Sequence, residues 1–126
     1  FVQADAGGVT QYYAAVVTTT AFVVDMIDTT NSAPGAQAGG IVCVPQVAIA
    51  ASGYGWGLVN GVGSVRTNAL AAKGTLLNTT ATAGQLDDDA TAGAEVINGI
   101  ALTAATGGAA ASTVAYLTYP SVGRTL

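Results

Sequence analysis

The chain has no histidine, a single cysteine and only three basic residues among its 126 amino acids. The lack of histidine removes Ser-His-Asp and Cys-His mechanisms and most zinc sites. With Cys43 alone, no intramolecular disulfide can form. Cys43 lies in the apolar run IVCVPQVAI, without a basic neighbour to lower its pKa, which favours a small buried side chain over a reactive thiol. We therefore expect neither an enzyme nor a cofactor site.

Charge is equally sparse. Charged residues make up 8% of the chain, and seven acidic residues give a net charge of −4. Binding to nucleic acid needs a basic patch that displaces counterions, and three basic residues cannot build one. An anionic membrane surface is disfavoured for the same reason, and no apolar run approaches the roughly 20 residues that span a bilayer. We expect neither nucleic acid nor a membrane as partner, and a surface packed among other proteins.

Small and β-branched residues dominate what is present. Hydrophobic residues make up 51% of the chain, but 26 of them are alanine, and there are 17 glycines. Valine and threonine favour strands, and glycine favours turns and bulges. A valine and alanine core buries little area, at roughly 25 cal/mol per Å², so a monomer is expected to be modestly stable and association would add to its stability.

Short strand-like segments alternate with turn signals along the chain and predict an all-β fold, a small antiparallel β-barrel or sandwich. Residues 1–11 are expected to form an extended N-terminal arm before a single β domain, residues 12–126. Within this domain an irregular loop is expected at 29–40 and an acidic loop at 81–95. Strands are expected at 12–28 with a break near 18–20, and at 41–50, 54–59, 62–67, 75–80, 96–105 and 112–120. The apolar run at 41–50 is expected to be covered on both faces.

Prolines and Asn-Gly dipeptides predict where strands end, bulge or turn. Pro45 cannot donate to a ladder, so its strand is expected to lie at an edge or to carry a bulge. Pro120 is expected to stop the last strand. The pair Asn98–Gly99 indicates a bulge inside its strand, and Asn60–Gly61 predicts a tight turn that joins 54–59 and 62–67 into a hairpin.

The segment SGYGWGLV places the only tryptophan among glycines. Strand alternation puts Tyr54, Trp56 and Leu58 on one face and Gly55 and Gly57 on the other. We expect the three large side chains to anchor the core, because an aromatic side chain buries roughly 150–250 Å². The glycine face would let another backbone or a large side chain lie flat against it.

One acidic run, Asp87, Asp88 and Asp89, is a weak candidate for a metal site. Carboxylate oxygens suit calcium, but consecutive residues of an extended chain point to alternate sides and the spacing of an EF-hand loop is missing. A solvated loop is the favoured interpretation, and no metal is expected. The aromatic residues leave a glycan-binding surface open as an alternative, with Tyr12, Tyr13, Tyr54, Trp56, Tyr116 and Tyr119 as candidates for stacking on sugars.

Between Gln46 and Pro120 the chain carries YGWGLVNG, then SVRTNALAAKGTLLNTTATAGQLDDD, then VINGIALTAATGGAAASTVAYLTYP. With AAKG before a strand and TATAG before an acidic turn, this series resembles the small head-decoration, or capsid cement, proteins of tailed phages. The resemblance implies a compact β-barrel or β-tulip-like domain, usually trimeric, on the outer surface of an icosahedral capsid, where it clamps adjacent capsomers. Its implied partners are the major capsid protein and further copies of the chain, as a homotrimer.

The resemblance makes a structural virion protein the leading functional hypothesis. A trimer engages several capsid subunits at once, so each contact can be weak. By analogy with other decoration proteins the N-terminal arm would order on the shell. The alternatives are a glycan-binding surface or adhesin module, and a subunit of another self-assembling structure such as a tail tube, filament or surface layer. The candidate interface residues are Phe1, Val2, Tyr12 and Tyr13.

Overall fold

The computed structural model describes residues 1–18, 22–28, 30, 40–68, 71–88, 96–104 and 111–122. These residues form eleven strands and no helix, which confirms the predicted all-β class. The strands are short, as expected for a chain in which glycine and small residues interrupt the β-branched runs. Their bounds are β1 Val2–Gln3, β2 Ala15–Val17, β3 Val24–Met26, β4 Val42–Pro45, β5 Tyr54–Gly55, β6 Gly57–Leu58, β7 Asn60–Thr67, β8 Leu76–Thr79, β9 Leu86–Asp87, β10 Val96–Leu102 and β11 Ala111–Val122.

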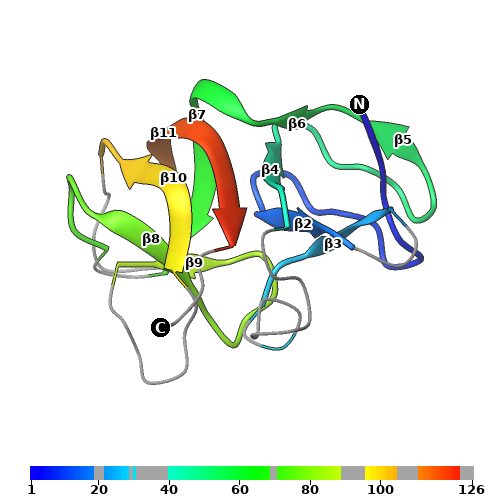
Figure 1. Cartoon of the computed structure of the whole chain (residues 1–126), viewed down its shortest axis with the longest axis horizontal. Coiled ribbons are helices and arrows are strands. Elements are labelled where there is room, and N and C mark those ends of the chain that lie inside the picture. The colour runs from blue at the N-terminus through cyan, green and yellow to red at the C-terminus, as the bar shows by residue number, and fades with distance from the viewer. Residues whose placement is uncertain are drawn as a thin grey trace.

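The second half of the chain closes into a small barrel with the strand order β10-β11-β7-β9-β8, as Figure 1 shows. Its longest ladder joins β7 to β11 in continuous antiparallel register, from Asn60 opposite Thr118 to Thr67 opposite Ala111. The pairing of β7 with β9 is parallel. Side chains alternate strictly along the middle of β11, inward at odd positions from 113 to 117 and outward at even ones. The inward residues fill the barrel, so the predicted small β-barrel is confirmed.

The first half of the chain lies beside the barrel (Figure 1) as a four-stranded antiparallel sheet, β3-β2-β4-β6, and a two-stranded pair, β1-β5. Strand β4 is covered on both faces, as its apolar run predicts. Val42 and Val44 pack into the barrel core, whereas Cys43 faces a second core cluster. That cluster consists of Ala4, Val9, Ala15, Val24, Cys43 and Ile49.

The expected extended arm, residues 1–11, is instead built into the domain. Strand β1 pairs with β5, and the Ala4 amide donates to the Gly53 carbonyl at 2.9 Å. Val9 exchanges backbone hydrogen bonds with Ile49 at 2.9 Å in both directions. Ala4 and Val9 are buried in the second core cluster. The polar composition of this segment hid these two apolar residues, which are enough to hold it against the sheet.

The prediction of a hairpin turn at Asn60–Gly61 is wrong. Both residues belong to β7, where Gly61 has a φ of 104° and pairs with Leu117. The segment before them divides into β5 and β6, which pair with β1 and β4. The uninterrupted ladder with β11 outweighs the local turn preference, because a turn at residue 60 would remove the first pairs of that ladder.

The expectations that Pro45 lies in an edge or bulged strand and that Pro120 stops the last strand are also wrong. The predicted bulge at Asn98–Gly99 is confirmed. Strand β4 is an inner strand that ends at Pro45. Strand β11 runs through Pro120 to Val122, and its register with β10 shifts between Asn98 and Ile100, around Gly99 with a φ of 85°. Pro120 is tolerated because it lies in this irregular stretch, where no regular ladder bond is required of its nitrogen.

The other predicted segments lie only partly within the residues that the structure describes. The region 12–28 does contain two strands, β2 and β3, on either side of the predicted break. The predicted loop 29–40 lies outside the described residues, apart from Thr30 and Gly40. The predicted acidic loop 81–95 is described only as far as Asp88 and contains β9, which the polar sequence did not indicate.

Candidate functional site

The expected core anchors Tyr54 and Trp56 lie on the surface, with 65% and 75% of their areas exposed. Leu58 is half-buried and packs against the barrel core. The large side chains and the glycines do alternate, but Tyr54 and Trp56 face solvent instead of the core. The space beneath this segment is already filled by Ile49 and Cys43, so only residues without side chains fit on the inward face.

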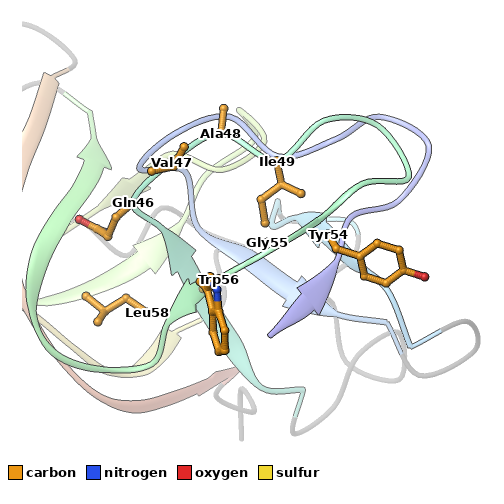
Figure 2. Close-up of a pocket in the computed structure, with 9 residues that line it drawn as sticks. Gln46, Val47, Ala48, Ile49, Tyr54, Gly55, Trp56 and Leu58 are labelled. Atoms are coloured by element: carbon orange, nitrogen blue, oxygen red, sulfur yellow. The ribbon is translucent and has the colours of Figure 1, made fainter.

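The two inward glycines show how tight that fit is. A Cβ at Gly55 would lie 2.7 Å from Ile49 Cγ1, and one at Gly57 would lie 2.5 Å from Cys43 Sγ. Figure 2 shows the Ile49 side chain directed toward Gly55. As predicted, a large side chain, that of Ile49, lies against the glycine face, and the smaller side chain of Cys43 lies beside it. Close packing below the segment directs Tyr54 and Trp56 outward.

Three aromatic rings gather on this surface. The ring of Phe1 stacks on that of Tyr54 with centroids 5.7 Å apart and planes at 4°. The Phe1 ring also contacts the Trp56 ring in a T-shaped arrangement, with centroids 5.2 Å apart and an interplanar angle of 69°. Both geometries are favourable for aromatic pairs. Phe1, Tyr54 and Trp56 are named here the aromatic cluster; it joins β1 to the β5–β6 segment on an exposed face.

An open groove of about 420 Å³ lies beside the aromatic cluster, between residues 46–49 and 54–58 (Figure 2). Val47 and Ala48 are exposed along its rim. The Gln46 amide is engaged elsewhere, since its oxygen accepts from the Ser64 amide and its nitrogen donates to the Ser64 carbonyl, both at 3.0 Å. The groove is lined by Gln46, Val47, Ala48, Ile49, Tyr54, Gly55, Trp56, Gly57 and Leu58, and its surface is mainly apolar.

The predicted interface residues divide into two groups. Phe1 belongs to the aromatic cluster, and Val2 pairs with Gly55 while packing on the second core cluster. Tyr12 and Tyr13 are half-buried and take no part in the ring contacts of Phe1. Both residues contribute to the fold, and their assignment to an interface stays a prediction. The Tyr12 amide donates to the Pro45 carbonyl at 2.8 Å, and the Tyr13 ring packs directly over Gly84.

The acidic run organises backbone. The Asp87 carboxylate accepts from the Asp88 amide at 2.8 Å and from the Asn68 side chain at 3.3 Å. The Asp88 carboxylate accepts from the Ala72 amide, and Asp89 lies outside the described residues. Where the structure describes the chain, no three acidic, cysteine or histidine side chains come together in a group that could hold a metal ion.

Cys43 is buried, as its apolar run predicts. Burial raises the pKa of its thiol to about 11, because the thiolate would lose its hydration inside the protein. A thiol that stays protonated at neutral pH is a poor nucleophile. Cys43 therefore serves as a packing residue beneath the groove.

Sequence reasoning missed the aromatic cluster as a surface feature. The groove itself is lined by residues 46–49 and 54–58, but the aromatic cluster also needs Phe1, which the pairing of β1 with β5 brings beside this segment. One usable signal was present: the stretch VAIAASGYGWGLV is rich in apolar side chains and has no charge.

Two further findings concern the chain as a whole. No helix of the described residues is long and apolar enough to cross a membrane. Comparison of the chain with protein-family models, with curated proteins and with solved structures found no match.

Proposed function

We propose that this chain is a structural virion protein that decorates the outer surface of an icosahedral phage capsid and stabilises it by bridging capsomers. The observation that carries the proposal is the aromatic cluster with its apolar groove. Exposed apolar patches mark interaction surfaces, and aromatic residues are enriched in protein–protein interfaces and their energetic hot spots. The sequence resemblance supplies the partner, the major capsid protein, and the homotrimer that would dock on it.

The physical character of the surface supports this role. A chain with three basic residues and a net charge of −4 has little scope for charge-based docking, so its affinity must come from apolar burial. Such contacts are weakly screened by salt. A capsid repeats the same site many times, and a trimer engages several sites together, so modest single contacts give firm attachment.

The test uses shells of the encoding phage prepared without this protein, to which the wild-type chain is added back. Wild-type protein is expected to bind and to raise the temperature at which the shells open. Trp56→Ser is expected to bind at least tenfold more weakly, because a central aromatic residue in an interface typically contributes about 2 kcal/mol or more. Phe22→Ser is the matched control, since Phe22 is an exposed ring outside the aromatic cluster. Shells that neither bind the protein nor gain heat resistance would refute the proposal.

Recognition of glycans is the second candidate, and the exposure of Trp56 favours it. An exposed ring beside a groove is also the arrangement of a small-ligand site. A glycan array probed with wild-type protein and Trp56→Ser, with and without a chelator, separates the candidates. Specific sugar binding that Trp56→Ser abolishes, together with no binding to shells, would support the glycan function instead.

A further inference from the structure

A second apolar surface crosses the outside of the barrel. Register aligns four residues on neighbouring strands: Val62 on β7 lies opposite Tyr116 on β11. Tyr116 lies opposite Ala101 on β10, and Ala101 lies opposite Leu76 on β8. Directly paired residues of a sheet point to the same side. These four residues therefore form one continuous row, which is named here the apolar band.

The apolar band faces outward. Val62, Leu76 and Tyr116 have 66%, 52% and 46% of their areas exposed. Their chain neighbours Leu77 and Leu117 are fully buried inside the barrel. The alternation therefore leaves large apolar side chains on the outer face where polar ones would be expected for a barrel surrounded by water.

The strands that carry the apolar band have almost no charge, although the exposed Lys73 lies in the loop before β8. Strands β7, β8, β10 and β11 contain one charged residue between them, Arg66, which lies two outward rows away from Val62. The adjacent rows pair Asn60 with Thr118 and Ser64 with Val114. An apolar centre with an uncharged polar rim is the composition of a protein interface.

We propose that the apolar band is the surface through which copies of this chain associate with each other. The chain has a net charge of −4, so two copies repel each other overall, and the strands of the band, which carry no acidic residue, offer a face through which they can meet. The band and the neighbouring exposed Val114 form the apolar centre of this face, which by itself is smaller than the roughly 800 Å² that each partner gives to a standard interface. The uncharged rows on either side supply the remainder.

The apolar band shares no residue with the aromatic cluster. Its Leu76 end lies on β8, and Figure 1 places β8 and β5 toward opposite ends of the long axis of the molecule. Its Val62 end lies on β7, whose Gly63 packs against Leu58 of the groove. Copies joined through the β8 side of the barrel would therefore keep their aromatic clusters free for another partner. This proposal rests on the proposed function for the expected trimer. Self-association is measured without any capsid, so self-association and capsid binding can each be refuted separately.

Sedimentation velocity of the full chain over a range of concentrations tests the proposal. Wild-type protein is expected to form a dimer or trimer. Val62→Lys and Leu76→Lys, each on a different strand, are expected to weaken association at least tenfold, because each would bury a charged side chain in an apolar contact. Val47→Lys is the matched control, since Val47 is an equally exposed valine, at 72%, on the rim of the groove.

Circular dichroism and thermal melting establish that the lysine variants remain folded. Val62→Thr, which keeps the shape of the side chain, provides a milder variant and is expected to weaken association by a smaller factor. A wild-type protein that stays monomeric at every concentration would overturn the proposal. So would association that Val47→Lys weakens as much as Val62→Lys, or that neither band variant changes.

Discussion

Gly57 lies directly against the thiol of Cys43, so closely that a Cβ at residue 57 would come within 2.5 Å of Sγ and 2.7 Å of the Cys43 Cβ. Strands β4 and β6 are hydrogen-bonded neighbours through Val44 and Leu58. The inward face of the β5–β6 segment consequently has no room for side chains. Together with the approach of Ile49 to Gly55, the contact of Gly57 with Cys43 explains why glycines flank the tryptophan: the glycines face inward and Trp56 faces outward.

Gly57→Ala is expected to destabilise the fold by about 1–3 kcal/mol, the usual cost of overpacking a filled core. Urea denaturation followed by circular dichroism measures the loss. The double variant Gly57→Ala with Cys43→Ala should recover part of it, since removal of the sulfur relieves the closest contact. Equal losses in the single and double variants would show that the two residues do not constrain each other.

Stability should depend on pH through Cys43. The thiol of the unfolded chain ionises near its ordinary pKa of 9.0, whereas burial raises the pKa of the folded thiol to about 11. Between these values the unfolded state has released a proton that the folded state keeps, so the free energy of unfolding falls as pH rises. The full loss is about 2–3 kcal/mol.

Denaturation curves from pH 8 upward, recorded for wild type and for Cys43→Ala, isolate this effect. Only wild type carries the Cys43 thiol, so its stability relative to Cys43→Ala should fall by about 2–3 kcal/mol across the interval and then level off. A constant difference at all pH values would contradict the assignment of a buried, protonated thiol.

Trp56→Ser should leave the fold intact, with a change in stability of no more than about 0.5 kcal/mol, because surface substitutions rarely cost more. Trp56 is the only tryptophan, so fluorescence of the wild type reports on it alone. The emission should resemble that of an indole in water and be readily quenched by acrylamide. Blue-shifted emission that resists quenching would place Trp56 in a buried environment and remove the aromatic cluster.

Gly99→Ala should cost more stability than Gly74→Ala, although both glycines have a φ of 85°. A Cβ at Gly99 would meet the Thr118 carbonyl oxygen at 2.6 Å, whereas nothing lies within 4 Å of one at Gly74. Gly74→Ala should cost about 1–2 kcal/mol for the left-handed backbone alone. The additional loss at Gly99 measures how rigidly the bulge between β10 and β11 is held. Similar losses at both positions would indicate that the bulge relaxes freely.

Sequence reasoning succeeded where one strand and its own composition decide the outcome. The all-β class, the coverage of β4 on both faces and the bulge at Asn98–Gly99 all depend on residues within a short window. The burial of Cys43 follows in the same way from its apolar neighbours.

Sequence reasoning failed where a residue far away in the chain determines the local structure. Asn60–Gly61 favours a turn in isolation, but β11 holds both residues in a long ladder. Trp56 is the natural core residue of its own segment, but Ile49 and Cys43 already occupy the space beneath it. The aromatic cluster could not be predicted for the same reason, since it needs the contact of Phe1 with a segment more than fifty residues later.

The place of β11 between β7 and β10 fixes the order in which the barrel can be completed during synthesis. A growing chain exposes β7, β8, β9 and β10 before β11 has emerged, and until then β7 and β10 each have one unpaired edge. Pairing across such long separations is slow, and open edges invite contacts with other chains. The barrel can close only when β11 has been synthesised, so it forms late. Until then the nascent chain must avoid pairing of β7 and β10 with strands of other chains.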